Sequence, residues 1–185
     1  MVDTIKNKLM DYVMVDNIFT SEECQTYMNK LNQTYWQPHR WYQNESDQYH
    51  DVKDFEVTYH TEIQTMMRDP VMKFVTKYFN THRSGGDPEC EFSGVRFNRY
   101  EVGESINYHV DHIHSLFDGK KRGIPVLSFV GVFNDDYEGG EFMLCDKEIK
   151  LKQGDCVIFP SVFLYPHEVK PVTKGTRYSW VLWSW

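Results

Sequence analysis

The chain has 185 residues, 41% hydrophobic and 25% charged, which suits one folded domain with its own core and excludes a disordered or collagen-like chain. Its 20 lysines and arginines against 27 aspartates and glutamates give a formal net charge of -7, which disfavours nucleic acid as a main partner. No continuous apolar run resembles a signal peptide or a membrane span, so we expect a soluble, cytoplasmic protein with no membrane partner.

The first predicted helix begins after Thr20. The segment from Thr20 to Glu23 (TSEE) has the pattern of a capping box, in which the threonine hydroxyl and the glutamate side chain each satisfy a free backbone amide. Residues with apolar side chains then recur at helical spacing, which predicts one amphipathic helix. These residues are Cys24, Tyr27, Met28 and Leu31.

A second helical pattern runs from about Tyr59 to Arg68. Asp69 and Pro70 then predict a restart, with the aspartate as cap and the proline in the first turn. The apolar stripe continues beyond Pro70, which we interpret as core. It consists of Val71, Phe74, Val75 and Tyr78.

Between these helices, residues 34–54 hold neither a helical nor a strand period. This pattern favours an irregular surface segment. The aromatic residues of the segment also allow a second interpretation, a flap that covers an extended substrate. Trp36, Trp41 and Tyr42 are the candidate contact residues of such a flap.

The pattern of apolar residues changes from helical to β after the Gly- and Pro-containing stretch at residues 83–90. Short strands between Gly, Pro and Asp turns then predict a sandwich or jelly roll, so the fold class is α+β. Residues 124–133 are apolar on both faces, as in a strand buried between a second sheet and packed helices. The predicted strands cover residues 92–100, 108–113, 124–133, 141–144, 156–159, 167–169 and 177–183.

A candidate metal site begins with His109 and Asp111. In an extended segment two side chains that are two residues apart project to one side, so both can reach one ion. His167, at the head of a late strand, supplies a second histidine. Two histidines and a carboxylate form the facial triad of non-haem iron(II) oxygenases.

His112 and His114 compete with this assignment, because both lie close to Asp111 and an H-x-D-H-x-H pattern also suggests zinc. Histidines packed so closely in the chain cannot all face one ion without distortion. We therefore interpret these two as loop residues or as neighbours of the ligands.

Arg177 lies ten residues after His167, beyond a turn-forming stretch, so the turn brings it beside the metal strand. Alternation places it on one face of its strand with Ser179, Val181 and Trp183. An inward arginine in an apolar barrel needs a partner, and its guanidinium fork suits a small dicarboxylate.

Several motifs together resemble the prolyl 4-hydroxylase-like branch of the iron(II)/2-oxoglutarate dioxygenases, over residues 92–185. The last motif is the most specific, because it links the metal histidine, the turn and the arginine. The motifs are RFNRYxxG at 96–103, HxD at 109–111, GGEF at 139–142, GDCVIFP at 154–160 and HxVxPVTxGxRYS at 167–179.

The resemblance implies a double-stranded β-helix (jelly roll) core with the N-terminal helices packed on one sheet. It implies a single domain over residues 1–185, with 1–90 as mainly helical support and 91–185 as the catalytic core. Its cofactors are Fe(II), 2-oxoglutarate as co-substrate and O2, with ascorbate as a candidate accessory reductant. It assigns His109, Asp111 and His167 to the metal, and Arg177, Tyr100, Ser179 and Trp183 to the co-substrate.

The implied function is hydroxylation of an unactivated C–H bond, with a prolyl residue of a peptide or protein as the favoured substrate. Collagen-type animal enzymes carry a lysine where this chain has Arg177, so the likeness is to the arginine-bearing branch. The alternatives are the same chemistry on a free amino acid or other small molecule, a nucleic-acid oxygenase, and a non-catalytic jelly-roll binding module. If the acidic residues 135–141 line the active-site mouth, a basic peptide is favoured.

Overall fold

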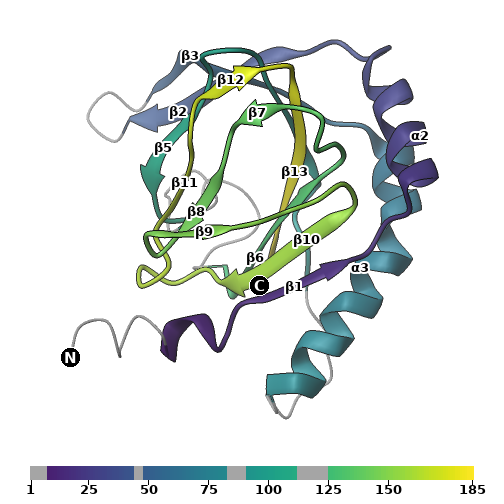
Figure 1. The fold of residues 1–185 in the computed structure, drawn as a ribbon, viewed down its shortest axis with the longest axis vertical. Helices are drawn as coiled ribbons and strands as arrows, with labels where there is room; N and C mark the ends of the chain where they lie inside the picture. The colour runs from purple at the N-terminus through teal and green to yellow at the C-terminus, as the bar shows by residue number, and fades with distance from the viewer. Residues whose placement is uncertain (1–7, 44–47, 83–90, 112–124) are drawn as a thin grey trace.

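The computed structural model describes residues 8–43, 48–82, 91–111 and 125–185. Two helices and a set of antiparallel strands make up most of this part of the chain (Figure 1). The helices are α2 (Ser21–Leu31) and α3 (Thr61–His82). The strands are β1 (Met14–Asn17), β2 (Gln37–Gln43), β3 (Gln48–Thr58), β4 (Arg96–Tyr100), β5 (Ile106–His109), β6 (Leu127–Val132), β7 (Glu138–Gly139), β8 (Phe142–Leu144), β9 (Lys147–Ile149), β10 (Asp155–Pro160), β11 (His167–Val169), β12 (Val172–Lys174) and β13 (Arg177–Ser184).

The strands form one large and one small antiparallel sheet that face each other as in a jelly roll (Figure 1). The large sheet has seven strands in the order β1-β10-β6-β13-β4-β3-β2, and the small sheet has four in the order β5-β11-β8-β9. A short ladder joins β12 to β7. Because the neighbours within each sheet are mostly distant in sequence, the sheets bring together residues from the whole chain.

Apolar side chains from both sheets meet between them in one hydrophobic cluster. Burying such side chains is the dominant favourable term in folding, so this cluster holds the two sheets together. Tyr100 of β4 and Val130 of β6 contribute from the large sheet, and Ile106 of β5 and Phe142 of β8 from the small sheet.

A second hydrophobic cluster lies on the outer face of the large sheet, where the ribbon shows α2 and α3 (Figure 1). Tyr27 of α2 packs edge to face against Phe19 and Phe133 at ring-centroid distances of 5.3 and 5.4 Å. All six residues of β6 are buried, as expected for a strand covered on both faces. β6 therefore separates the two clusters, and its inner face is free to support a site between the sheets.

The predicted capping box of α2 is confirmed. The Thr20 hydroxyl accepts a hydrogen bond from the Glu23 amide at 3.2 Å, and the Glu23 carboxylate accepts one from the Thr20 amide at 2.8 Å. Two of the unpaired amides at this helix end are thereby satisfied, which defines its start.

The predicted restart at Asp69 and Pro70 is wrong, because α3 runs without interruption from Thr61 to His82 with Pro70 inside it. The proline removes one backbone hydrogen bond. The apolar stripes on its two sides are in phase, so a single helix buries both. The buried stripe consists of Ile63, Met67, Val71, Phe74, Val75 and Tyr78.

The interpretation of residues 34–54 as irregular is also wrong. Most of the segment forms the β2 and β3 hairpin, and β3 continues the large sheet by pairing with β4. The register of the hairpin shifts between Pro38 and Arg40, which breaks the two-residue alternation that identifies a strand in a sequence.

The later strands agree with the sequence pattern, with changed bounds. The strand predicted at 108–113 is β5 and ends at His109, and the one predicted at 124–133 is β6. The predicted break at residues 83–90 lies outside the described residues. Neither described helix has the length and apolar character needed to cross a membrane.

Candidate metal centre

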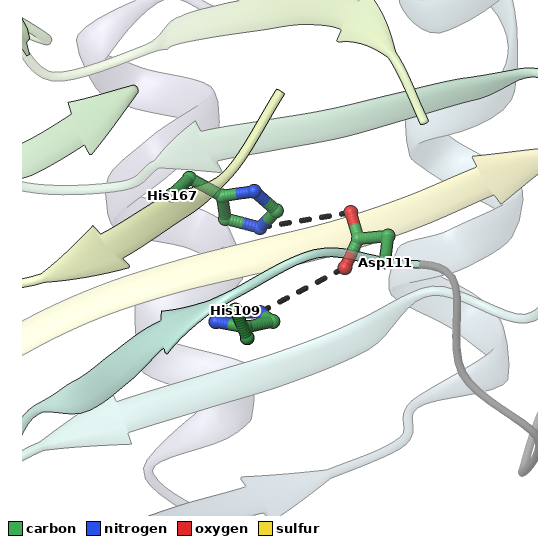
Figure 2. A group of neighbouring side chains, drawn as sticks. All are labelled: His109, Asp111 and His167. Atoms are coloured by element: carbon green, nitrogen blue, oxygen red, sulfur yellow. Dashed lines mark ion pairs between the residues drawn. The ribbon is translucent and has the colours of Figure 1, made fainter. Parts of the chain in front are cut away.

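His109, Asp111 and His167 lie together between the two sheets (Figure 2). β5 and β11 are antiparallel neighbours in which His109 and His167 are directly opposite each other, and Asp111 follows two residues after the end of β5. One ligand atom from each residue lies within 4.8 Å of the others. His109 Nε2 is 3.8 Å from Asp111 Oδ1, and His167 Nε2 is 3.6 Å from Asp111 Oδ2.

The backbone holds both imidazole rings in one tautomer. The Nδ1 atom of His109 lies 2.7 Å from the carbonyl oxygen of Asn107, and that of His167 lies 3.1 Å from the carbonyl oxygen of Tyr165. A carbonyl only accepts hydrogen bonds, so Nδ1 carries the proton in each ring. Each Nε2 lies toward the carboxylate of Asp111, which is the arrangement found in metal-binding histidines.

Asp111 is 5% exposed and is held by side chains of the large sheet. The hydroxyl of Ser128 donates to Asp111 Oδ2 at 2.5 Å, and that hydroxyl also lies 2.6 Å from the hydroxyl of Ser161. Burial alone would raise the pKa of Asp111, but the two histidines and hydrogen bonds from Ser128 and Trp183 outweigh it and lower the pKa. The carboxylate is therefore ionised at neutral pH.

His109 is uncharged at neutral pH. Burial, with His167 as the second cause, lowers its pKa to about 4. A neutral imidazole is the form that binds a metal ion. The group thus offers two imidazole nitrogens and one carboxylate, a donor set that fits Fe(II) with positions left open for other ligands.

Arg177 begins β13 and lies in the large sheet directly opposite Tyr100 of β4. It is 1% exposed. Its Nη1 donates to the Ser179 hydroxyl at 2.7 Å, while its buried Nε has no hydrogen-bond partner. Among the described residues no carboxylate forms an ion pair with Arg177, so this buried cation fits an external carboxylate.

Two aromatic rings lie beside the Arg177 guanidinium, whose carbon is 5.2 Å from the ring centroid of Tyr100 and 6.0 Å from that of Tyr137. The Tyr100 ring is stacked on Phe55 at 4.6 Å. Burial raises the pKa of Tyr100 to about 12, so its hydroxyl keeps its proton and can donate a hydrogen bond.

The GGEF motif makes room for this arginine. Gly140 has φ 65°, which disfavours residues with a Cβ, and a Cβ at this position would lie 3.0 Å from Arg177 Cδ. Gly140 therefore allows the turn after β7 to pass close to the arginine side chain.

Every residue that the sequence pattern and the resemblance assigned to the metal or the co-substrate lines one pocket between the sheets. The predicted alternation of β13 is confirmed, because Arg177, Ser179, Val181 and Trp183 all line this pocket. The other proposed residues that line it are Tyr100, His109, Asp111 and His167.

Some expectations fail or fall outside the described residues. Trp36 is 7% exposed, and its indole donates to the Leu31 carbonyl on the outer side of the large sheet, so it does not contact the pocket. The acidic residues 135–141 do not line the pocket either. The side chains of Trp41 and Tyr42 and the histidines at 112 and 114 lie outside the described part of the structure.

The sequence analysis missed the residues that support the site from neighbouring strands. Ser128 of β6 reaches Asp111, and Arg96 and Asn98 of β4 line the pocket beside the metal residues. Sequence spacing alone contained a signal for Arg96 and Asn98, because they precede Tyr100 by four and two residues and must share its face of a strand. Nothing local indicates Ser128.

Comparison with known proteins finds similar sequences for the part of the chain that holds these residues. Residues 95–185 match the model of the 2OG-Fe(II) oxygenase superfamily, whose cofactors are Fe(II), 2-oxoglutarate and O2. A PKHD-type hydroxylase of Pseudomonas aeruginosa is 37% identical over 95 residues, which cover 48% of this chain and 41% of that protein. The matched region is thus less than half of that relative's length.

Solved structures share the fold over almost the whole chain. A prolyl-4-hydroxylase of Pseudomonas putida superposes with a TM-score of 0.67 at 16% identity, covering 100% of this chain and 98% of that one. A prolyl hydroxylase of Trichoplax adhaerens, in complex with a peptide fragment of hypoxia inducible factor, superposes with a TM-score of 0.63 at 15% identity, covering 99% and 90%. At such identities the likeness establishes the jelly-roll fold alone.

Proposed function

We propose that this chain, whose residues 95–185 match the model of the 2OG-Fe(II) oxygenase superfamily, is an iron(II)- and 2-oxoglutarate-dependent hydroxylase. The proposal rests mainly on one observation: a single pocket contains both the group of His109, Asp111 and His167 and the buried Arg177. Among the described residues, Arg177 has no carboxylate partner. A binding module of the same fold would need neither the metal group nor the buried arginine.

The roles of the residues follow from their geometry. The Nε2 atoms of His109 and His167 and the Asp111 carboxylate hold Fe(II), and Arg177 holds the distal carboxylate of 2-oxoglutarate. The Tyr100 hydroxyl would donate a hydrogen bond to the same carboxylate, Ser179 fixes the guanidinium by accepting a hydrogen bond from it, and Trp183 forms a wall beside Asp111.

When bound, iron, 2-oxoglutarate and O2 together supply the oxidative decarboxylation that yields succinate, carbon dioxide and a hydroxylated product. The protein contributes orientation and exclusion of water. Apolar side chains of both sheets surround the metal residues, with the Phe159 ring at 5.0 Å and the Phe142 ring at 5.7 Å from the His167 ring. Such a dry chamber protects a reactive site from side reactions.

A prolyl residue in a peptide or protein is the proposed substrate. Support comes from the names of the similar structures, a prolyl-4-hydroxylase and a prolyl hydroxylase bound to a peptide. In the described sheet β2 is the edge strand, and an edge strand suits the addition of an extended peptide. A free amino acid is the second candidate, because the positive charge of Arg96 in the pocket lining suits its carboxylate.

Anaerobic Fe(II) titration and succinate formation test the metal assignment. Asp111→Ala should lose both measurable iron affinity and turnover, because two imidazoles remain without the anionic ligand. Glu168→Gln is the matched control, since Glu168 follows His167 on β11 but pairs with Lys170 at 2.7 Å. Unchanged iron affinity in Asp111→Ala, with the circular dichroism of the wild type, would contradict the proposal.

Mass spectrometry of products tests the substrate. Proline-containing peptides and free proline are compared for stimulated succinate formation and for added oxygen, with and without ascorbate. Oxygen on a prolyl residue of a peptide is the expected result. Oxygen on another residue, or stimulation by the free amino acid alone, would replace peptidyl proline and leave the dioxygenase assignment in place.

A further inference from the structure

Arg96 is a second arginine in the same pocket. On β4 the side chains of Arg96, Asn98 and Tyr100 share the inner face, and all three line the pocket. The Arg96 guanidinium carbon lies 5.3 Å from the ring centroid of Trp183, the residue that donates a hydrogen bond to Asp111. It also lies 5.7 Å from the ring centroid of Phe55. Arg96 therefore stands beside the metal residues.

The guanidinium of Arg96 is held in place by neutral groups. Its Nε donates to Asn98 Oδ1 at 3.1 Å, and its Nη1 lies 3.3 Å from His39 Nε2. On its other side, the His39 ring places Nδ1 3.4 Å from Asp54 Oδ2. Burial lowers the pKa of His39, so the neutral ring donates to Asp54 through Nδ1 and accepts from Arg96 through Nε2. These hydrogen bonds orient Arg96. The groups that contact its guanidinium are neutral, so they do not offset its positive charge.

Among the described residues no carboxylate forms an ion pair with Arg96, and its Nη2 donates no hydrogen bond. Asp111 is the only acidic residue of the described chain that lines the pocket. With Fe(II) and the 2-oxoglutarate dianion bound, the negative charges of Asp111 and the co-substrate would offset the positive charges of the iron ion and Arg177. One positive charge would then remain in the pocket. That charge is Arg96.

The position of Arg96 separates it from the co-substrate anchor. Arg177 is opposite Tyr100 in the sheet, whereas Arg96 is opposite Val181, four residues further along β13. Four residues correspond to roughly 13 Å of strand at about 3.3 Å per residue. Through His39, Arg96 also contacts the β2 and β3 hairpin at the sheet edge, where a peptide would lie.

We infer that Arg96 binds a carboxylate of the substrate, an inference that rests on the proposed function. The carboxylate belongs either to a free amino acid or to an acidic residue next to the hydroxylated position of a peptide. In both cases one charge-assisted pair selects an acid over its uncharged amide. The acidic residues 135–141 do not line the pocket, so they do not oppose this preference.

Binding without turnover provides the first test. The protein is loaded with Mn(II) and 2-oxoglutarate, and tryptophan fluorescence follows two sets of probes. One set contains free amino acids and their amides, and the other contains proline peptides with Glu or Gln beside the proline. We expect the wild type to bind at least one acid about 10- to 100-fold more tightly than its matched amide. Arg96→Met should remove this difference, and Arg96→Lys should restore part of it.

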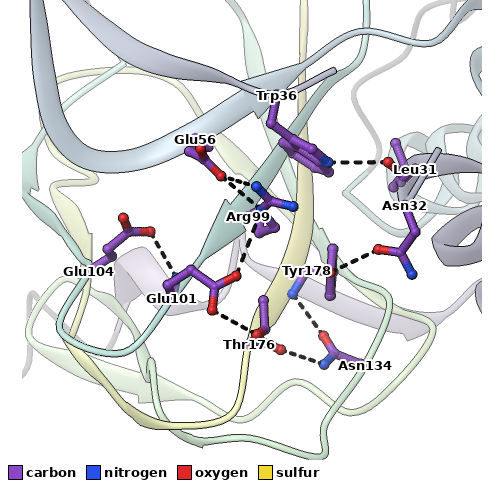
Figure 3. Close-up of polar contacts among 10 residues, drawn as sticks. All are labelled: Leu31, Asn32, Trp36, Glu56, Arg99, Glu101, Glu104, Asn134, Thr176 and Tyr178. Atoms are coloured by element: carbon purple, nitrogen blue, oxygen red, sulfur yellow. Dashed lines mark hydrogen bonds and ion pairs between the residues drawn. The ribbon is translucent and has the colours of Figure 1, made fainter. Parts of the chain in front are cut away.

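Arg99 on the same strand supplies the matched control. It faces away from the pocket, where its side chain pairs with Glu56 and its guanidinium carbon lies 4.9 Å from the Trp36 ring (Figure 3). Arg99→Met removes the same charge from the protein and should keep the full preference for acids. Thermal melting of the three variants shows whether each is folded under the binding conditions.

The outcomes separate the inference from the proposed function. A preference seen with free amino acids identifies a small substrate, and one seen with Glu peptides identifies a peptide; both support a role for Arg96. Equal affinity for acids and amides in the wild type, a preference that survives Arg96→Met, or a variant that mainly loses 2-oxoglutarate affinity would overturn it. A wild type that forms no succinate with Fe(II) and any probe would instead contradict the proposed function.

Discussion

Ser128 donates a hydrogen bond of 2.5 Å to the Oδ2 atom of Asp111 across 17 positions of sequence. Ser128 belongs to the large sheet and Asp111 follows β5 of the small sheet, so the bond fixes the carboxylate of the metal group against the large sheet. Because Ser128 is 1% exposed, water cannot replace it easily. The geometry of the metal group thus depends on how the two sheets are placed relative to each other.

Ser128→Ala should therefore weaken iron binding about 10- to 100-fold without removing any ligand, as is typical when a partner of a metal ligand is lost. The buried carboxylate would keep its charge and lose a donor. Anaerobic Fe(II) titration measures the change. Ser161→Ala is the control, because Ser161 contacts the Ser128 hydroxyl at 2.6 Å and should have a smaller effect. Equal losses in both variants would contradict a direct role for Ser128.

Gly131→Ala should destabilise the fold. Gly131 lies opposite Trp180 in the pairing of β6 with β13, and an added Cβ would clash with the buried indole ring. Overpacking of this kind costs about 1 to 3 kcal/mol or more in the free energy of unfolding, measured by urea denaturation. Gly94→Ala is the matched control, since the nearest atom to its added Cβ is Gln64 Oε1 at 3.7 Å. A stable Gly131→Ala variant would show that Trp180 can repack.

The sequence predicts best where one short segment contains the whole signal. Thr20 and Glu23 satisfy each other within one turn, and His109 and Asp111 share one side of an extended segment, so both could be identified by spacing. The proximity of His109 and His167 could be predicted only by assuming the jelly-roll fold. That assumption came from a resemblance in which several motifs occur in a fixed order.

The features that were missed depend on register between distant strands. Ser128 reaches Asp111 only because β6 and β5 lie in facing sheets, and His39 reaches Arg96 only because β2 and β3 extend the sheet beyond β4. The hairpin itself was hidden by the register shift at Pro38. In α3 the local rule for Pro70 was outweighed by the burial of one continuous apolar stripe.

Acid should destabilise the fold at His39, which contacts the pocket residue Arg96. Burial lowers the pKa of His39 below its ordinary value of 6.5, so between that value and the folded pKa the unfolded chain binds more protons. The stability that the neutral ring contributes is present above pH 6.5 and is lost as the pH falls below it. His39→Gln cannot titrate, so the difference in unfolding free energy between wild type and variant should shrink from pH 7 to pH 5. A constant difference in denaturation experiments across this range would contradict the assignment of a neutral His39.

Arg177→Lys should weaken 2-oxoglutarate binding at least tenfold, about 1.4 kcal/mol, and leave Fe(II) affinity nearly unchanged. A lysine keeps the charge but loses the planar fork that bonds Ser179 and leaves Nε for the carboxylate. Tyr100→Phe should cost less, about 0.5 to 3 kcal/mol, because the ring beside the guanidinium stays and only the hydroxyl is lost. Calorimetric titration of 2-oxoglutarate into the Mn(II)-loaded protein measures both effects. If Tyr100→Phe loses more affinity than Arg177→Lys, the hydroxyl is the main anchor. If neither changes the affinity, the co-substrate binds elsewhere in the pocket.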